Sequence, residues 1–440
     1  KDSESSLFPY YTDDKITESV EITGSKTILQ VHKNGKTYLW EPFSDRYAGI
    51  YATNRNLYKN SIGNKVIFEE INKDLGLTYR YQWNSSNKFG FVRKSTLLND
   101  SISPLKVVLL DGLQNILPYG VETNLQNSRS NLVDAYKKSE LESEVGIGIY
   151  ALSAIIVDKA EPSEALKATT VWSSGIENAT YLLSSLQIDN FRKGQKISQE
   201  VDVKAEKGAY FVCSEMTLEP GSEKKWMLVT DVNQTMVNIT EIADLIKKGI
   251  DLEALVQEDI ELGSKKLLEL TAASDGVQLT ADSLMNTRHF SNTLFNIMRG
   301  GIFDDGYQIE KWDFVKYIEG ANKKIFKKKE ELLANLPEKF PLSYLKELAR
   351  KDADKNFKRL AIEYMPLKFS RRHGDPSRPW NKFSINTTSE LDGSKILDYE
   401  GNWRDIFQNW EALAHSYPEF IESMIHKFLN ATTFDGYNPY

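Results

Sequence analysis

The densest group of side chains capable of chemistry lies in residues 401–411, which read GNWRDIFQNWE. The segment combines three aromatic rings with an Arg–Asp pair, amides and a second carboxylate. Flat apolar rings suit the faces of pyranose sugars, and fixed hydrogen-bond donors and acceptors suit sugar hydroxyls. This mixture therefore predicts a sugar-binding element around residue 405.

A helix that begins near Trp403 would bring these groups together. Residues three, four and seven apart share a helix face, so Arg404 and Gln408 fall on one row and Asp405 on the next. We expect Asp405 to accept hydrogen bonds from two sugar hydroxyls while Arg404 orients it, with Trp403 beside them. The other aromatic residues of the helix are expected in the core. An ion pair at a helix N-terminus above a buried aromatic face explains the same composition equally well.

A second dense stretch precedes the first, in residues 371–381 (RRHGDPSRPWN). Glycine and proline at this density indicate an ordered loop rather than a helix. We interpret the loop as a wall of the same site, in which an indole stacks on a sugar face; a surface loop held by its own Arg–Asp pairs is the alternative. The binding residues predicted in it are Arg372, His373, Asp375, Arg378 and Trp380.

A third cluster contains Arg288, His289, Asn292 and Asn296, and it precedes the pair Gly300–Gly301. The glycine pair predicts a helix end. Arg288 and His289 could reach a cleft from that helix, but we favour a structural role for them.

Composition excludes several classes of function. The chain has 440 residues, of which 40% are hydrophobic and 27% charged, typical of a soluble protein of two or three domains. Its net charge of −7 argues against a nucleic-acid partner, because phosphate neutralisation requires clustered Lys and Arg. No apolar run approaches the roughly 18 residues of a membrane span. The compartment, cytoplasmic or periplasmic, stays open.

The sequence predicts neither a metal site nor an organic cofactor. The five histidines show no metal-ligand spacing, and no phosphate-binding loop or dinucleotide fingerprint occurs. The single cysteine, Cys213, follows Tyr-Phe-Val in a run typical of a buried strand. We therefore expect a structural thiol rather than a nucleophile.

The pattern along the chain predicts a multidomain β plus α protein. Residues 1–237 contain more than a dozen short β-rich runs, and Asn34-Gly35 predicts a hairpin, which together indicate a large antiparallel sandwich. From residue 238 onward, apolar residues recur at helical spacing. We predict a helical linker over residues 238–275 and a mainly helical domain over residues 276–440.

This domain order and the motif Trp403-Arg404-Asp405 resemble the six-hairpin glycosidase superfamily, and most closely the glycoside phosphorylases of the cellobiose phosphorylase type. Those proteins have an N-terminal antiparallel β-supersandwich, a helical linker and an (α/α)6 barrel that carries the active site. The resemblance implies the same architecture here. We expect the barrel to be incomplete, because only its first few helices fit after residue 280. The motif implies that Arg404 and Asp405 bind a sugar in subsite −1.

The resemblance also implies an inverting reaction on an oligosaccharide, polysaccharide or other glycoside. A carboxylic acid would protonate the glycosidic oxygen, and either water activated by a second carboxylate or inorganic phosphate as co-substrate would attack. Asp405 is not that acid, because its arginine neighbour keeps it ionised. We expect the acid to lie beyond residue 440 and the chain alone to be inactive. Hydrolysis and phosphorolysis, the sugar and its linkage, and a homodimer all stay open.

A non-catalytic carbohydrate-binding or scaffolding protein is the alternative. In that case aromatic residues of the β domain would line a glycan groove, although core packing explains most of them. The candidates are Trp40, Tyr47, Tyr51 and Trp83.

Overall fold

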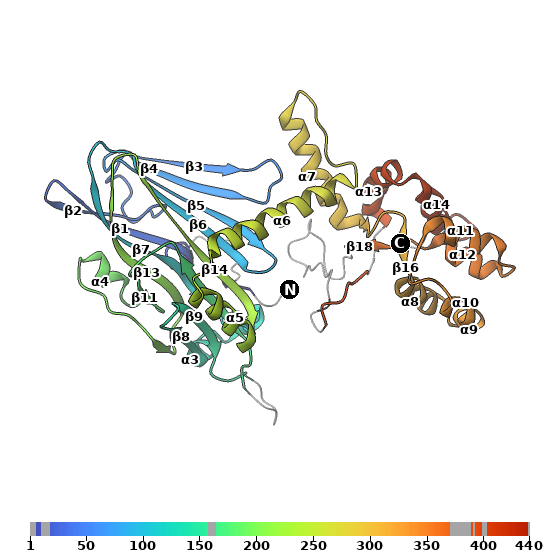
Figure 1. Cartoon of the computed structure of the whole chain (residues 1–440), viewed down its shortest axis with the longest axis horizontal. Helices are drawn as coiled ribbons and strands as arrows, with labels where there is room; N and C mark the ends of the chain where they lie inside the picture. Colours follow the sequence, from blue (N-terminus) through green and yellow to red (C-terminus); the bar gives the residue numbers. More distant parts are fainter. Residues whose placement is uncertain are drawn as a thin grey trace. The chain divides into compact units, whose positions relative to one another are not determined.

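The chain divides into two compact units, a β unit of residues 2–264 and a helical unit of residues 265–440. The computed structural model describes residues 6–9, 18–156, 164–369, 389, 392–397 and 403–438, without the side chains of 123, 124, 127 and 403–405. Strands dominate the first unit and helices the second (Figure 1). The predicted β plus α fold is confirmed at this level, and the division falls inside the segment predicted as a linker.

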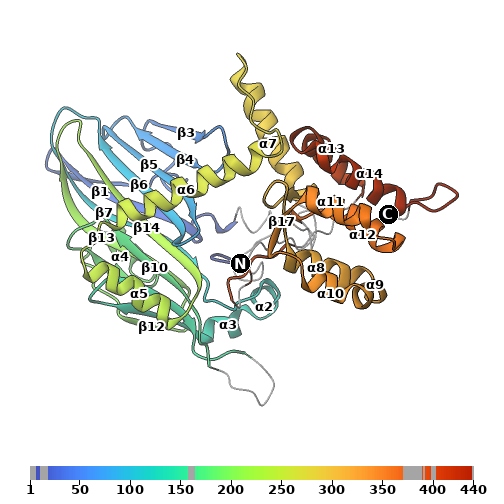
Figure 2. The same ribbon diagram turned by 45° about the vertical axis from the view of Figure 1, so that its right-hand side comes forward.

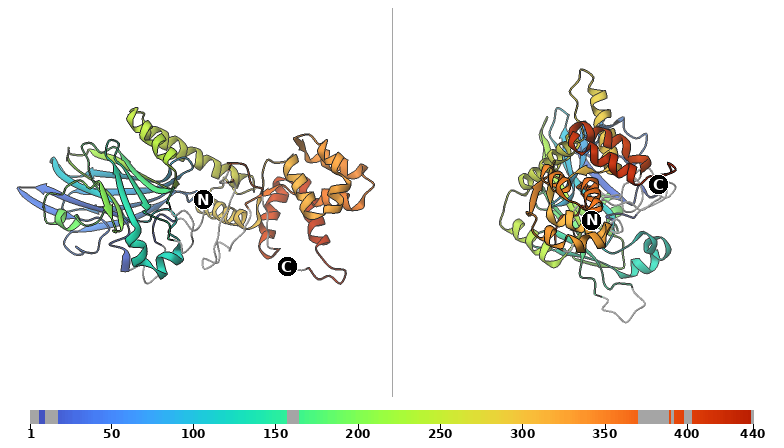
Figure 3. Two further views of the ribbon diagram at one scale, coloured as in Figure 1. Left: turned by 90° about the horizontal axis from the view of Figure 1, so that it is seen from below. Right: turned by 90° about the vertical axis from the view of Figure 1, so that its right-hand side faces the viewer.

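Two antiparallel sheets form the β unit (Figure 3). The smaller has the order β11-β13-β7-β1-β2 and comprises β1 (Gly24–Lys33), β2 (Lys36–Trp40), β7 (Leu105–Ile116), β11 (Thr180–Leu182) and β13 (Gly208–Leu218). The larger has the order β12-β8-β9-β10-β14-β6-β5-β4-β3. It comprises β3 (Thr53–Lys59), β4 (Val66–Asn72), β5 (Leu77–Ser86), β6 (Gly90–Asn99), β8 (Lys137–Glu142), β9 (Ile147–Leu152), β10 (Ala168–Ser174), β12 (Asp202–Lys204) and β14 (Glu223–Gln234).

The predicted first hairpin is confirmed. Strands β1 and β2 pair in register from Leu29 with Trp40 to Lys33 with Lys36. The two turn residues, Asn34 and Gly35, have φ values of 53° and 72°. Asparagine and glycine tolerate this left-handed conformation, which matches the twist of a two-residue hairpin.

Short helices cover the outer faces of both sheets. Helices α5 (Met236–Lys247) and α6 (Leu252–Ala272) bury apolar residues of β6, β9, β10 and β14 in one core cluster (Figure 2). Helix α4 (Ile188–Arg192) covers the five-stranded sheet, and α2 (Thr123–Ser128) and α3 (Ser130–Tyr136) precede β8. The N-cap of α5 is Thr235, whose hydroxyl and backbone form a capping box with Asn238. The N-cap therefore lies three residues before residue 238, at which the helical linker is predicted to begin.

A buried ion pair joins the two sheets. The side chains of Arg93 on β6 and Asp111 on β7 are fully inaccessible to solvent and form a salt bridge. Asp111 also accepts hydrogen bonds from Thr27 Oγ1 at 2.6 Å, Trp226 Nε1 at 2.6 Å and Tyr79 OH at 3.3 Å. Donors from four other strands thus compensate a charge that would be very costly to bury alone.

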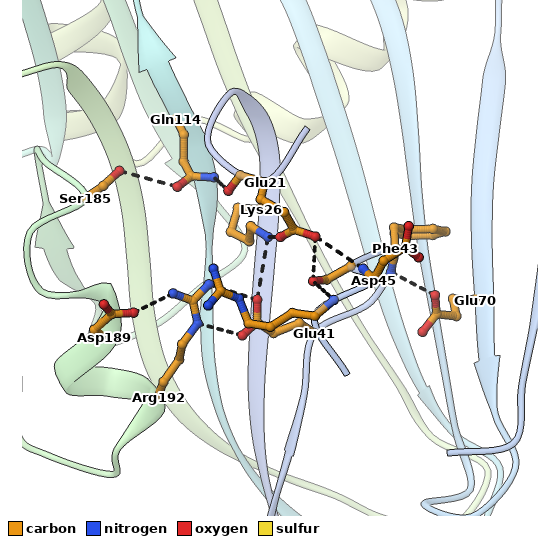
Figure 4. A network of polar contacts seen from close by, with 12 residues as sticks. Glu21, Lys26, Glu41, Phe43, Asp45, Glu70, Gln114, Ser185, Asp189 and Arg192 are labelled. Atoms are coloured by element: carbon orange, nitrogen blue, oxygen red, sulfur yellow. Dashed lines mark hydrogen bonds and ion pairs between the residues drawn. The ribbon is translucent and has the colours of Figure 1, made fainter. Parts of the chain in front are cut away.

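A second charged network holds α4 against the five-stranded sheet (Figure 4). The side chain of Glu41 is inaccessible to solvent and accepts two hydrogen bonds from Arg192, at 2.6 and 3.0 Å. Lys26 Nζ lies 3.5 Å from the same carboxylate and also pairs with Glu21. Arg192 completes the network with a 2.7 Å contact to Asp189. Because its charges are paired with one another, we interpret the network as structural.

The helical unit contains a segment that is closed at its base by two short strands. Strand β15 (Ile302–Phe303) pairs with β18 (Leu367–Lys368), so the chain leaves and returns at the same place. Between them lie α8 (Lys311–Ala321), α9 (Lys323–Lys328), α10 (Glu330–Ala334), α11 (Leu342–Lys351), α12 (Lys355–Glu363) and the paired strands β16 (Gln308–Glu310) and β17 (Lys339–Pro341).

Helices α7 (Ser283–Gly300) and α13 (Trp403–Ser416) flank that closed segment in the sequence and pack against each other. The 3-10 turn η1 (Pro418–Phe420) and α14 (Ile421–Asn430) follow. One core cluster unites α7 and α13 with the closed segment through Ile297, Phe314 and Trp410. In the described part of the chain, no helix is both long and apolar enough to cross a membrane.

Candidate functional site

Helix α13 begins at the predicted sugar-binding motif. Trp403, Arg404 and Asp405 form its first turn, and their side chains lie outside the described structure. Gln408 follows one turn later and is exposed. The five loop residues predicted to bind ligand also lie outside the described residues, so their roles stay predictions: Arg372, His373, Asp375, Arg378 and Trp380.

A glycine lets α13 approach α7 closely. A Cβ atom at Gly300 would lie 2.7 Å from Cβ of Asn409, so a larger residue would push the helices apart. Asn409 Nδ2 donates a hydrogen bond to the carbonyl of Gly301, and Trp410 Nε1 donates one to the carbonyl of Gly300 at 3.4 Å. Gly301 has φ 78° and caps α7, which confirms the predicted helix end.

The aromatic residues of α13 do not all enter the core. Trp410 is buried, but Phe407 is 49% exposed and packs edge-on against Phe428 of α14 at 5.7 Å. The expectation of a buried aromatic row is wrong for Phe407. The buried face of α13 is formed by Ile406, Trp410 and Leu413. Phe407 follows Ile406 directly and therefore points about 100° away from that face, because a helix turns by about 100° at each residue.

A polar pocket of about 300 Å³ lies along the contact between α7 and α13. Four amide side chains line it, and we call it the amide pocket: Asn292, Asn296, Gln408 and Asn409. Its remaining lining residues are Asp275, His289, Thr293, Glu411, Ala412 and His415. The predicted Gln408 therefore borders a cavity, and so do His289, Asn292 and Asn296, for which the sequence favours a structural role.

Two of the amides are nearly buried yet incompletely paired. Asn409 is 1% exposed, and its Oδ1 is buried without a hydrogen-bond partner. Asn296 is 5% exposed, and within the described residues its amide takes part in no hydrogen bond. Such groups cost free energy unless something pairs with them.

Charges in the pocket are limited to carboxylates and imidazoles. Asp275 and Glu411 are exposed, and one ring nitrogen of His289 lies 2.7 Å from the backbone oxygen of Asp275. Among the residues that the structure describes, neither lysine nor arginine lines the pocket. Among the described residues, no group of three potential metal ligands occurs. The pocket therefore suits an uncharged ligand rich in hydroxyl groups better than an anion or a metal ion.

The aromatic candidates of the β unit have mixed surroundings. Trp40 is 2% exposed and donates to Glu70 at 2.8 Å, so it belongs to the core. Tyr51 donates its hydroxyl to the carbonyl of Leu39. Trp83 lines a pocket of about 480 Å³ together with Phe8 and other largely apolar residues.

Burial raises the pKa of Cys213 to about 11, which agrees with a structural thiol.

Lys395 attaches the chain upstream of α13 to the closed segment. Its Nζ lies 2.6 Å from Asp304 and 2.5 Å from Glu310, and Lys368 contacts Asp304 at 3.2 Å. The hydrogen bond from Lys395 lowers the pKa of Glu310 below its ordinary value of 4.5.

The contact predicts a specific pH dependence of stability. The pKa of Glu310 is lower in the folded state than in the unfolded state. The ion pair therefore adds to the free energy of unfolding above about pH 4.5, and this stabilisation is lost as the pH falls through the folded-state pKa. We expect Lys395→Gln to cost about 0.5–1 kcal/mol at pH 7, with the difference from wild type shrinking below pH 4.5. Thermal unfolding of both proteins from pH 7 to pH 3 measures this, and a difference that does not change with pH would refute it.

Residues 303–366 match the family model "Glycoside hydrolase family 149 insertion domain 1". These limits coincide with the strands β15 and β18 that close the segment. The predicted resemblance to glycoside hydrolases and phosphorylases is confirmed at this level. The helices between residues 303 and 366 are thus similar to that insertion domain.

Solved structures with some likeness to the chain include three sugar-active proteins. A bacterial glucoamylase complexed with acarbose has a TM-score of 0.38 and 11% identity, covering 74% of this chain and 45% of that one. A putative kojibiose phosphorylase from the human microbiome has a TM-score of 0.28 and 10% identity, covering 66% and 30%. A family GH92 α-mannosidase from Bacteroides thetaiotaomicron has a TM-score of 0.28 and 10% identity, covering 56% and 28%.

The chain therefore spans less than half the length of each of these three proteins. All three TM-scores are low, and the proposals below do not rest on them. No curated protein matches the chain.

Proposed function

We propose that the chain is part of a glycoside hydrolase or phosphorylase whose sugar site lies on the helical unit. One observation carries the proposal. Residues 303–366 match an insertion domain of a glycoside hydrolase family, and the strands at its base leave α7 and α13 in direct contact. Helices α7 and α13 are then a hairpin of an (α/α)6 barrel that the insertion interrupts.

In this proposal the first turn of α13 binds the sugar in subsite −1. Asp405 stays ionised beside Arg404 and accepts hydrogen bonds from two hydroxyl groups, while Gln408 donates or accepts one turn further along. The reaction inverts the anomeric centre. A carboxylic acid other than Asp405 protonates the glycosidic oxygen, and either activated water or inorganic phosphate attacks from the opposite face.

A glycan array followed by a turnover assay, each with and without inorganic phosphate, tests the proposal. We expect saccharide binding, and release of a reducing sugar or a sugar phosphate by the full-length protein. Turnover that requires phosphate identifies a phosphorylase, and turnover without it identifies a hydrolase. Binding without turnover would favour the non-catalytic alternative, and absence of any saccharide binding would overturn the proposal.

A further inference from the structure

The amide pocket has the composition of a binding site rather than of a packing defect. Nine of its ten lining residues carry a polar side chain, and Ala412 is the exception. Four of them come from one face of α7, at positions 289, 292, 293 and 296, which is the spacing of neighbours along a helix. The facing residues of α13 are also polar at positions 408, 409, 411 and 415.

The two nearly buried amides point to a missing partner. Asn296 and Asn409 are 5% and 1% exposed, and both line the cavity. Asn409 is held by its Nδ2 donation to Gly301, which leaves its Oδ1 as an unpaired acceptor. Asn296 offers both a donor and an acceptor, and in the described residues neither is used. The Oδ1 of Asn409 is closed to solvent, whereas the Asn296 amide is not among the closed-off polar atoms and so opens into the cavity, where a bound ligand can pair with it.

The chemistry of the lining selects the class of ligand. Amide groups are donors and acceptors at once, as hydroxyl groups are, so the two pair in either direction. Asp275 and Glu411 disfavour phosphate and carboxylate ligands, and the described part of the lining contains no lysine or arginine to offset them. The volume of about 300 Å³ is at the lower end of the roughly 300–1,000 Å³ found for small-molecule sites.

From these observations we infer that the amide pocket is a second subsite, which binds one neutral pyranose ring or a polyol of similar size. The inference rests on the proposed function, because α13 carries both sites. Arg404 precedes His415 by eleven residues, which corresponds to about 16 Å along a helix. A bound saccharide in this pocket would therefore be close to the proposed subsite −1, and Gln408 borders both sites while Asn296 and Thr293 belong to the pocket alone.

The test uses the substitution Asn296→Leu, which removes the amide and keeps a similar volume. If Asn296 serves a ligand, the variant should keep its thermal stability, since within the described residues the amide makes no hydrogen bond that the substitution would break. Its affinity for neutral monosaccharides and polyols should fall about tenfold, as expected when the hydrogen bonds of one amide are lost. Asn356→Leu, at an exposed position of α12, is the matched control and should bind as wild type.

Calorimetric titrations with a neutral hexose, a hexitol, a hexuronate and inorganic phosphate provide the readout. We expect binding of the neutral ligands to weaken in Asn296→Leu and in Thr293→Val, and any binding of phosphate or hexuronate to be the same in wild type and Asn296→Leu. Wild-type affinity for the neutral ligands in Asn296→Leu, loss of stability in that variant, or phosphate binding that weakens in it would overturn the inference. If Asp405→Ala loses affinity for saccharides and Asn296→Leu does not, this inference is wrong and the proposed function stands. If the wild-type protein binds no saccharide, both are wrong.

Discussion

Replacement of Asp405 by alanine should lower the catalytic efficiency of the full-length protein on a glycoside by at least about tenfold. We expect a higher KM and a lower kcat, because hydrogen bonds from sugar hydroxyls to an ionised carboxylate are each worth about 1.5–3 kcal/mol. Steady-state kinetics on the substrate found in the glycan screen measures the effect.

The control for this variant is Glu347→Ala, which removes a carboxylate from an exposed ion pair on α11. It should leave both kinetic constants unchanged. If Asp405→Ala retains activity within about twofold of wild type, the assignment of subsite −1 is wrong. Saccharide binding that survives the substitution would instead place the site elsewhere, with the pocket beside Trp83 as the next candidate.

The second large effect concerns stability. Asp111→Asn should destabilise the β unit by about 3–5 kcal/mol, because it leaves the guanidinium of Arg93 buried without a counter-charge. Arg93 does not escape this by losing its proton, because a guanidinium stays protonated in proteins. In the wild type, burial lowers the pKa of Arg93, and the charge of Asp111 more than offsets that effect. Urea unfolding followed by tryptophan fluorescence is a suitable measurement, because Trp226 donates directly to Asp111.

A surface pair on the same strand provides the comparison. Lys106 on β7 and Glu215 on β13 lie 2.8 Å apart with both side chains more than half exposed. Removing Glu215 should cost no more than about 1 kcal/mol. Equal losses for Glu215→Ala and Asp111→Asn would mean that the inter-sheet ion pair has no special role.

Local sequence patterns predicted the elements that depend on neighbouring residues. The Asn34-Gly35 hairpin, the end of α7 at the glycine pair and the start of α13 near Trp403 all follow from short-range rules. Strand β3 escaped prediction because all seven of its residues are exposed, which leaves no alternation of apolar and polar side chains. The partners of Asp111 come from four other strands, and no local pattern indicates which strands meet.

In the helical unit and its site, too, local patterns do not indicate which distant segments come together. Helical periodicity over residues 303–366 does not reveal that these helices form a segment closed at its base, because the closure consists of two strands of two residues each. The polar face of α7 is visible in the spacing of His289, Asn292 and Asn296. Its significance emerges only when α13, more than a hundred residues later, supplies the opposite wall of the amide pocket.

A crystal structure of the protein with a bound oligosaccharide tests the central claim most directly. The account predicts a pyranose ring at the first turn of α13, with two of its hydroxyls within hydrogen-bond distance of the Asp405 carboxylate. Density for the sugar on the β unit alone, with Arg404 and Asp405 turned away from it, would contradict the account.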